Sequence, residues 1–289
     1  MNNVRAVFSL SGIHFRKWGS SYRILVIFVL LILTLYNALT GIRSLCTDID
    51  IPVSPWSLMA ITSTYFTYII LLMGYVFLYC DAPFLDEQQP YVILRCGRKM
   101  FCKAQILYIA LSSLIYTFFV FGVTLLFTLP NISFSTQWGK VLNTLALTNL
   151  NSKYANILEM SDTILQMPAL EAFAKQILLL WLTGCFIGLL IFVLNLKFSR
   201  VVGISCAAIL VFMNMFASMF SISHGQFGGV IYWFLPTAWA NLGILQSRAS
   251  DPLPPFAYAV GMLIFLNALF SIIIYKMFKK KEIEVLPQI

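Results

Sequence analysis

Charged and histidine side chains are scarce in this sequence, and their scarcity excludes most soluble protein classes. Only 10% of the 289 residues are charged and 60% are hydrophobic, whereas soluble domains contain roughly 25% charged residues. Because so little polar surface could not cover a soluble globule, we interpret the chain as an integral membrane protein. Its net charge of +8 does not indicate nucleic-acid binding, since the basic residues stand at the ends of apolar runs and form no stripe with interleaved aromatic residues.

Patterns typical of enzymes and nucleotide-binding sites are absent as well. The sequence has no HExxH, GxSxG or GxxxxGK[ST] motif, so it lacks the usual elements of a metallohydrolase, a serine hydrolase or a P-loop. Its six cysteines show no CxxC spacing, and its two histidines offer few further zinc ligands. We expect no catalytic residue, no cofactor and no metal in this chain, and we expect any ATP and Mg to be bound by a partner.

The sequence does contain six apolar runs, each near the roughly 20 residues that a helix needs to cross a bilayer. The predicted fold class is therefore an all-α integral membrane protein, in which residues 1–289 form a single transmembrane domain. The centres of the runs contain no Asp, Glu, Lys or Arg, which argues against a proton or sodium relay. The predicted spans are 22–40, 57–79, 104–129, 170–195, 201–222 and 256–278.

Residues 1–20 precede the first span and have the pattern of an amphipathic helix that lies in the membrane interface. The residues Leu10 and Ile13 depart from the pattern, and a disordered basic leader is the alternative. At helical spacing one side gathers Val4, Val7, Phe8, Phe15 and Trp18, and the other gathers Arg5, Ser9, Gly12 and Arg16.

Lysine and arginine are concentrated in alternate flanks of the spans, which predicts the orientation of the chain. The flanks before the first span, between the second and third, between the fourth and fifth, and after the sixth hold most of them. Both termini and residues 81–103 are therefore expected in the cytoplasm, and residues 130–169 and 223–255 on the outer side. The chain is predicted to be a multi-pass protein of a bacterial cytoplasmic (inner) membrane.

Residues 230–245, in the last outer segment, are apolar and aromatic but too short to span, and Pro236 interrupts them. This composition predicts a re-entrant or interfacial element buried against protein. An aromatic anchor at the outer membrane interface is the alternative.

The fourth predicted span contains a GxxxG motif formed by Gly184 and Gly188. Small residues at this spacing let two helix backbones approach closely. The contact could lie within the chain or between two subunits. Asn195, Asn214 and Asn267 are among the neutral polar residues expected to hydrogen-bond between helices.

Residues 81–103 form the densest block of charge between two apolar runs. Pro90 cannot easily continue a preceding helix, so a short helix is expected to begin near it, with acidic residues before it and basic residues near its end. Its apolar side chains need burial, either in the lipid interface or in a groove on a cytoplasmic protein. The order along the chain is Asp86 and Glu87, then Tyr91 to Leu94, then Arg95, Gly97, Arg98 and Lys99.

This segment, with the amphipathic leader and the six spans, resembles the membrane subunits of type-2 ABC exporters, including bacterial permeases linked to antimicrobial peptide export and immunity. The resemblance implies a coupling helix seated on a separate ATP-binding subunit, and a second permease chain, identical or similar, that completes the transport path. It implies contacts with the ATPase from Asp86, Glu87, Tyr91, Ile93, Leu94, Arg95, Arg98 and Lys99.

The function expected from this resemblance is export of a peptide, a lipid-like molecule or another amphipathic compound. The expected partners are ABC ATP-binding subunits, a second permease chain and membrane lipid. Two alternatives stay open. The basic residues of 81–103 could contact lipid headgroups only, and the chain could be a non-transporting accessory or sensory subunit that docks a cytoplasmic partner through the same loop.

Overall fold

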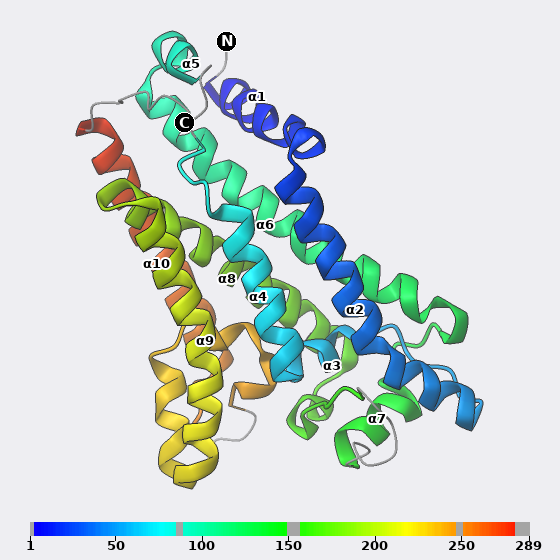
Figure 1. The fold of residues 1–289 in the computed structure, drawn as a ribbon. Coiled ribbons are helices and arrows are strands. Elements are labelled where there is room, and N and C mark those ends of the chain that lie inside the picture. The colour runs from blue at the N-terminus through cyan, green and yellow to red at the C-terminus, as the bar shows by residue number, and fades with distance from the viewer. Residues whose placement is uncertain (1–2, 85–88, 149–156, 247–250, 281–289) are drawn as a thin grey trace.

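The computed structural model describes residues 3–84, 89–148, 157–246 and 251–280, and these ranges form a tilted bundle of helices (Figure 1). Within them the only β-type pairing is an isolated bridge between Val53 and Ile132. The α-helices are α1 Asn3–Arg16, α2 Tyr22–Ile49, α3 Leu58–Ser63, α4 Tyr65–Tyr79, α5 Gln89–Cys96, α6 Arg98–Thr128, α7 Gly139–Leu147, α8 Ala169–Lys197, α9 Arg200–His224 and α10 Phe256–Lys280. The 3₁₀ segments are η1 Trp18–Ser20, η2 Leu129–Asn131, η3 Asp162–Gln166, η4 Gly225–Trp233, η5 Ala238–Ala240 and η6 Leu242–Ile244.

Within the described residues five helices are long and apolar enough to cross a membrane, namely α2, α6, α8, α9 and α10. Five of the six predicted spans thus correspond to single helices, although some boundaries were wrong. The helix α2 continues past residue 40 because Arg43 and Asp48 do not interrupt it. It ends at Asp50, whose left-handed φ of 55° closes the helix through a hydrogen bond from its N–H to the Cys46 carbonyl.

The prediction of one continuous helix over 57–79 was wrong, because the chain breaks at Thr64 into α3 and α4. Thr64 is extended, with φ −80° and ψ 116°. Its hydroxyl lies 3.0 Å from the Ala60 carbonyl and accepts the Glu159 N–H at 3.0 Å, and the Thr67 hydroxyl donates to the Ile61 carbonyl at 2.6 Å. The Thr67 hydroxyl thus satisfies the Ile61 carbonyl, which the break releases, whereas the Ala60 carbonyl still accepts the Thr64 N–H at 3.1 Å. A layout of six crossings remains a prediction, since α4 alone has 15 residues.

The helix α8 lies at the centre of the bundle. Of its most apolar stretch 67% is buried inside the protein, against 17% for α10. Gly184 and Gly188 face α4 and α6 within the chain: a Cβ on Gly184 would lie 2.5 Å from the Tyr75 ring, and one on Gly188 would lie 2.9 Å from the Tyr79 ring. The two tyrosine hydroxyls pair with hydroxyls of α6, at 2.7 Å to Thr117 and 3.0 Å to Ser112.

Residues 225–246 fold back from the end of α9, and most of residues 235–246 are buried against protein, whereas Val230 and Phe234 are exposed. The segment η4 returns along α9, and η5 and η6 pack on α8. Trp239 is 1% exposed, and its indole N–H donates to the Tyr232 carbonyl at 2.6 Å, so this side chain is no anchor at a lipid interface. The Gln176 amide of α8 pairs with backbone groups of Ala240 and Leu242.

The bundle has two distinct ends (Figure 1). One, which we name the α5 end, contains α1, α5, the start of α6 and the end of α10. The opposite α7 end contains α7 and the segments that join α2 to α3 and α6 to α7. There the Ser54 hydroxyl donates to the Trp138 carbonyl at 2.6 Å, and the Trp56 indole N–H donates to the Ser135 carbonyl at 3.0 Å. These contacts hold the two joining segments together.

The packing at Gly184 predicts a large cost for a single methyl group. In Gly184→Ala the new Cβ would lie 2.3 Å from the Ser113 hydroxyl oxygen, and overpacking of this kind destabilises by roughly 1–3 kcal/mol. Gly261→Ala on α10 is the matched control, because nothing lies within 4 Å of its Cβ position. Thermal unfolding in detergent should give a lower Tm for Gly184→Ala only. Equal Tm values for the two variants would contradict this packing.

Candidate functional site

The charged segment between α4 and α6 lies at the α5 end. It consists of a turn at residues 81–84, the short helix α5 and the single residue Gly97 before α6. Asp86 and Glu87 lie outside the described residues, as does the side chain of Tyr91, whose backbone belongs to α5. The site is therefore built from Ile93, Leu94 and Arg95 on α5 and from Arg98 and Lys99 on α6.

The helix α5 presents one side to the bundle and the other to the surroundings. Ile93 is 6% exposed and belongs to the main hydrophobic core, so it contacts the chain itself and is not available to a partner. Leu94 is 84% exposed, and Arg95 beside it is also exposed. Of the apolar residues expected to contact an ATPase, Leu94 is the one whose described side chain is exposed.

Gly97 separates α5 from α6 and makes a sharp joint between them. Its φ of 81° lies in the region that favours glycine. Its N–H donates to the Ile93 carbonyl at 2.8 Å, and its carbonyl accepts the Phe101 N–H at 3.2 Å, so it ends one helix and starts the next. The predicted loop over 81–103 therefore stops at Gly97, because residues 98–103 already belong to α6.

Arg98 and Lys99 stand in the first turn of α6 and are exposed. Positive side chains are unfavourable at a helix N-terminus, where the backbone dipole is itself positive. The stability of α6 therefore does not explain why Arg98 and Lys99 stand at its start. Together with Arg95 across the joint, they form a basic rim beside Leu94, and we name Leu94, Arg95, Arg98 and Lys99 the outward face.

The turn at 81–84 is fixed to the bundle by hydrogen bonds and an ion pair. Asp81 pairs with Arg23 of α2. The Asn195 amide of α8 donates to the Ala82 carbonyl at 2.6 Å, and the Gln105 amide of α6 donates to the Pro83 carbonyl at 2.8 Å. Among these residues the sequence analysis had named only Asn195 as a hydrogen-bonding candidate. For Arg23 and Gln105 the only signal in the sequence was a single polar side chain near the end of an apolar run.

The helix α1 packs on α6 only partly with the side chains that sequence periodicity favoured. The ring centroid of Phe15, from the predicted apolar side, lies 5.0 Å from that of Tyr108 on α6. Leu10 is 8% exposed and His14 6% exposed, whereas Phe8, assigned to the apolar side, is 53% exposed. The His14 ring lies among aromatic rings, with centroid distances of 5.1 Å to Tyr108 and 5.9 Å to Phe84. The contact with Phe84 joins α1 to the 81–84 turn.

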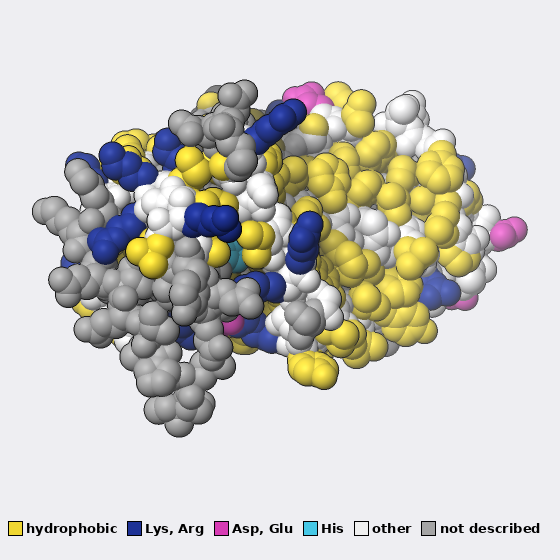
Figure 2. Space-filling model, turned by 90° about the horizontal axis from the view of Figure 1, so that it is seen from above, with side chains coloured by type: hydrophobic (Ala, Val, Ile, Leu, Met, Phe, Trp, Pro, Cys, Tyr) yellow, Lys and Arg dark blue, Asp and Glu magenta, His cyan; other side chains and the backbone are white. Residues whose placement is uncertain are grey.

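Basic side chains are gathered over the α5 end, beside a broad apolar flank (Figure 2). By element, they are Arg5 and Arg16 on α1, Arg95 on α5, Arg98, Lys99 and Lys103 on α6, Lys197 on α8, Arg200 on α9 and Lys276 on α10. At the α7 end the described bases are Arg43, Lys140 and Lys175. The charge asymmetry expected from the sequence is thus an asymmetry between the two ends of the described bundle.

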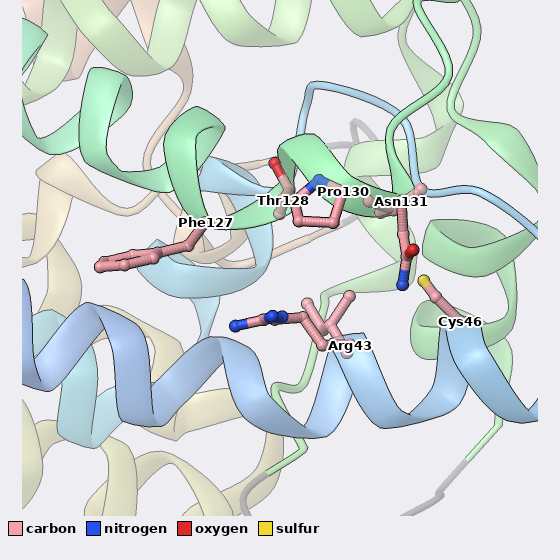
Figure 3. Close-up of a pocket in the computed structure, with 8 residues that line it drawn as sticks. Arg43, Cys46, Phe127, Thr128, Pro130 and Asn131 are labelled. Carbon is pink, nitrogen blue, oxygen red and sulfur yellow. The ribbon is translucent and has the colours of Figure 1, made fainter.

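Outside the outward face, the candidates for a further site are a metal-binding group and a pocket. Among the described residues no group of three or more His, Cys, Asp or Glu side chains could hold a metal ion. A shallow hollow lies between α2 and the end of α6, lined by Arg43 and Cys46 on one side and by Phe127, Pro130 and Asn131 on the other (Figure 3). It encloses no cavity.

Comparison with known proteins finds no relative: no protein-family model and no curated protein matches this chain. The assignment of a function therefore rests on the outward face, the basic α5 end and the sequence resemblance.

The buried His14 predicts that docking of α1 depends on pH. Burial, with a smaller contribution from the Lys17 charge, lowers the pKa of His14 from 6.5 to about 4. Undocked α1 would bind a proton below pH 6.5, whereas the docked helix would not until about pH 4. Docking is therefore complete above pH 6.5 and weakens as the pH falls toward 4, by at most roughly 3 kcal/mol.

The measurement is the mobility of a spin label at Phe8→Cys in a background without the native cysteines. The mobile fraction should rise between pH 6.5 and 4 in the native sequence and should stay constant in His14→Phe, which keeps the aromatic contacts. An equal pH response in both proteins would show that another group controls docking.

Proposed function

We propose that this chain is the membrane subunit of an ATP-driven exporter of the type-2 ABC kind, with energy supplied by a separate ATP-binding subunit. The observation that supports it best is the outward face. A short helix is anchored to the bundle through Ile93, while Leu94 and a rim of basic side chains face outward at the end of the molecule richest in Lys and Arg. An exposed apolar residue surrounded by charge is typical of a protein-docking surface.

The proposed arrangement in the membrane follows from the charge asymmetry. The positive-inside rule assigns the α5 end to the cytoplasm of a bacterial inner membrane and the α7 end to the outer side. On this assignment α3 and α4 together make a sixth crossing that is interrupted at Thr64, and both termini are cytoplasmic. The ATPase then docks on the same side as α1 and α5.

The fold-back at 225–246 would then enter the bundle from the outer side. Thr237 bonds to the Leu210 carbonyl of α9 at 2.9 Å, and Leu210 lies 14 residues before the last residue of α9, His224. At 1.5 Å per residue this corresponds to about 21 Å along the helix. Such a depth favours a re-entrant element over an interfacial one, because the backbone of the fold-back then bonds to neighbouring helices rather than facing lipid.

The proposed cargo is an amphipathic compound such as a peptide or a lipid-like molecule, and the path lies between this chain and a second permease chain. The absence of Asp, Glu, Lys and Arg from the centres of the spans supports this class over ions. Docking of a cytoplasmic partner by a non-transporting accessory subunit would use the same outward face, so the experiment must separate the two functions.

The first experiment is purification from native membranes in mild detergent, followed by an ATPase assay. We expect a nucleotide-binding protein to accompany the chain, and its hydrolysis rate to respond to amphipathic peptides or lipids. A cytoplasmic partner without nucleotide binding would identify the accessory function instead. Purification with no nucleotide-binding protein at all would remove the basis for the exporter.

Variants of the outward face test where that partner binds. Leu94→Asp places a charge at the centre of the face and Arg95→Glu reverses its nearest basic residue, so each should weaken ATPase association at least tenfold, about 1.4 kcal/mol. Lys140→Glu, an exposed base on α7 at the other end, is the matched control and should bind normally. Unchanged association of Leu94→Asp would place the docking surface elsewhere.

A further inference from the structure

The four residues of the 81–84 turn are contacted by side chains from four helices. Arg23 of α2 pairs with Asp81, and Asn195 of α8 donates to the Ala82 carbonyl at 2.6 Å. Gln105 of α6 donates to the Pro83 carbonyl at 2.8 Å, and the His14 ring of α1 lies 5.9 Å from the Phe84 ring. Four helices thus meet on four consecutive residues.

The two amide contacts are buried and specific. Gln105 and Ala82 are each 0% exposed, and Asn195 is 7% exposed. The turn follows α4, and the last carbonyls of a helix have no partner within the helix. Here the Tyr79 carbonyl accepts the Ala82 N–H at 3.0 Å, and the carbonyls of Ala82 and Pro83, beyond the helix end, accept the amides of α8 and α6. Their loss would leave buried carbonyls without donors.

Asn195 is itself held in place by α9. A Cβ on Gly203 would lie 1.9 Å from the Asn195 side-chain oxygen, so the two helices approach closely at this glycine. Gly203 therefore allows Asn195 to reach the turn. Substitution of Gly203 offers a way to displace the Asn195 amide without changing its chemistry.

The turn is covalently linked to α5, which begins at Gln89. The other end of α5 is joined to α6 through Gly97. A displacement of α5 can therefore act on the bundle through the core contacts of Ile93, through the Gly97 joint, or through the 81–84 turn, which residues 85–88, outside the described residues, connect to α5. The Gly97 joint reaches α6 alone, whereas the turn reaches α1, α2, α6 and α8.

We propose that Asn195 and Gln105 are positioning residues which, with Arg23 and His14, fix the 81–84 turn and through it the placement of α5, so that a displacement of α5 reaches four helices at once. The placement of α5 depends only on this chain. The transmission of an ATPase-driven displacement rests on the proposed function.

The test of placement is hydrogen exchange of the full chain in lipid nanodiscs. Asn195→Leu and Gln105→Met remove the donated hydrogen bonds at nearly constant volume, and Gly203→Ala displaces Asn195. Each should speed exchange of the α5 amides at least tenfold. Asn267→Leu is the matched control, because the Asn267 amide also donates to a backbone carbonyl, that of Leu182 at 3.1 Å, far from the turn along α8. It should leave α5 unchanged.

A charge-exchange experiment controls for general misfolding of the variants. Arg23→Asp and Asp81→Arg should each loosen α5, and the double variant should restore native exchange by re-forming the pair in reverse. Exchange of α5 that stays native in Asn195→Leu and Gln105→Met, or that rises equally in Asn267→Leu, would overturn the positioning role.

A second arm tests transmission in the complex with its ATPase. Asn195→Leu and Gln105→Met should keep ATPase association, because the outward face is intact, but should lower the amount transported per ATP hydrolysed at least tenfold. A native ratio with a loosened α5 would overturn transmission while leaving placement valid. If no ATPase accompanies the chain, the proposed function fails, and the exchange measurement still decides the placement of α5.

Discussion

A backbone group that leaves a helix inside an apolar bundle must find a hydrogen-bonding partner, because neither lipid nor the packed interior supplies water. The chain interrupts its helices inside the bundle at three places, and each interruption is satisfied by neutral side chains. At the break between α3 and α4 the Thr67 hydroxyl donates to the Ile61 carbonyl, and the Thr64 hydroxyl accepts the Glu159 N–H. Amides of Asn195 and Gln105 serve the turn after α4, and the Gln176 amide serves the fold-back after α9.

This constraint explains why a chain with so few charges retains polar residues in its spans. Asn195, Gln105 and Gln176 are at most 7% exposed, and each donates to a carbonyl that its own helix does not contain. They are placed where irregular backbone enters the bundle. The polar residues of the spans therefore stabilise the irregular segments. The two ends of α4, one near the fold-back and the other at the 81–84 turn, contact different parts of the chain.

Hydropathy was sufficient to locate most of the fold, because long apolar runs have few alternatives to a spanning helix. It missed the break at Thr64, since the groups that stabilise the break include the Glu159 N–H, far along the chain. Periodicity placed Leu10 outside the pattern of α1, although Leu10 is buried on α6. An amphipathic pattern indicates which side is apolar on average, whereas the side that packs is chosen by the shape of the partner helix.

The candidate site was predictable in its chemistry and less so in its geometry. Proline and the order of charges indicated a short helix near Pro90, and a helix does occupy Gln89–Cys96. Ile93 and Leu94 are adjacent and equally apolar, so the sequence does not show that one is buried and the other exposed. The partners of the 81–84 turn come from four separate helices, and pairings over such distances along the chain depend on how the helices assemble.

The central position of α8 gives its helical register unusual importance. Gln176, Gly184, Gly188 and Asn195 lie on this one helix, and their contacts reach the fold-back, α4, α6 and the 81–84 turn. With 3.6 residues per turn, one inserted residue rotates everything after it by about 100°. An insertion just after Gln176 would therefore misdirect Gly184, Gly188 and Asn195 together, and their contacts with α4, α6 and the 81–84 turn would be lost through a change at one position.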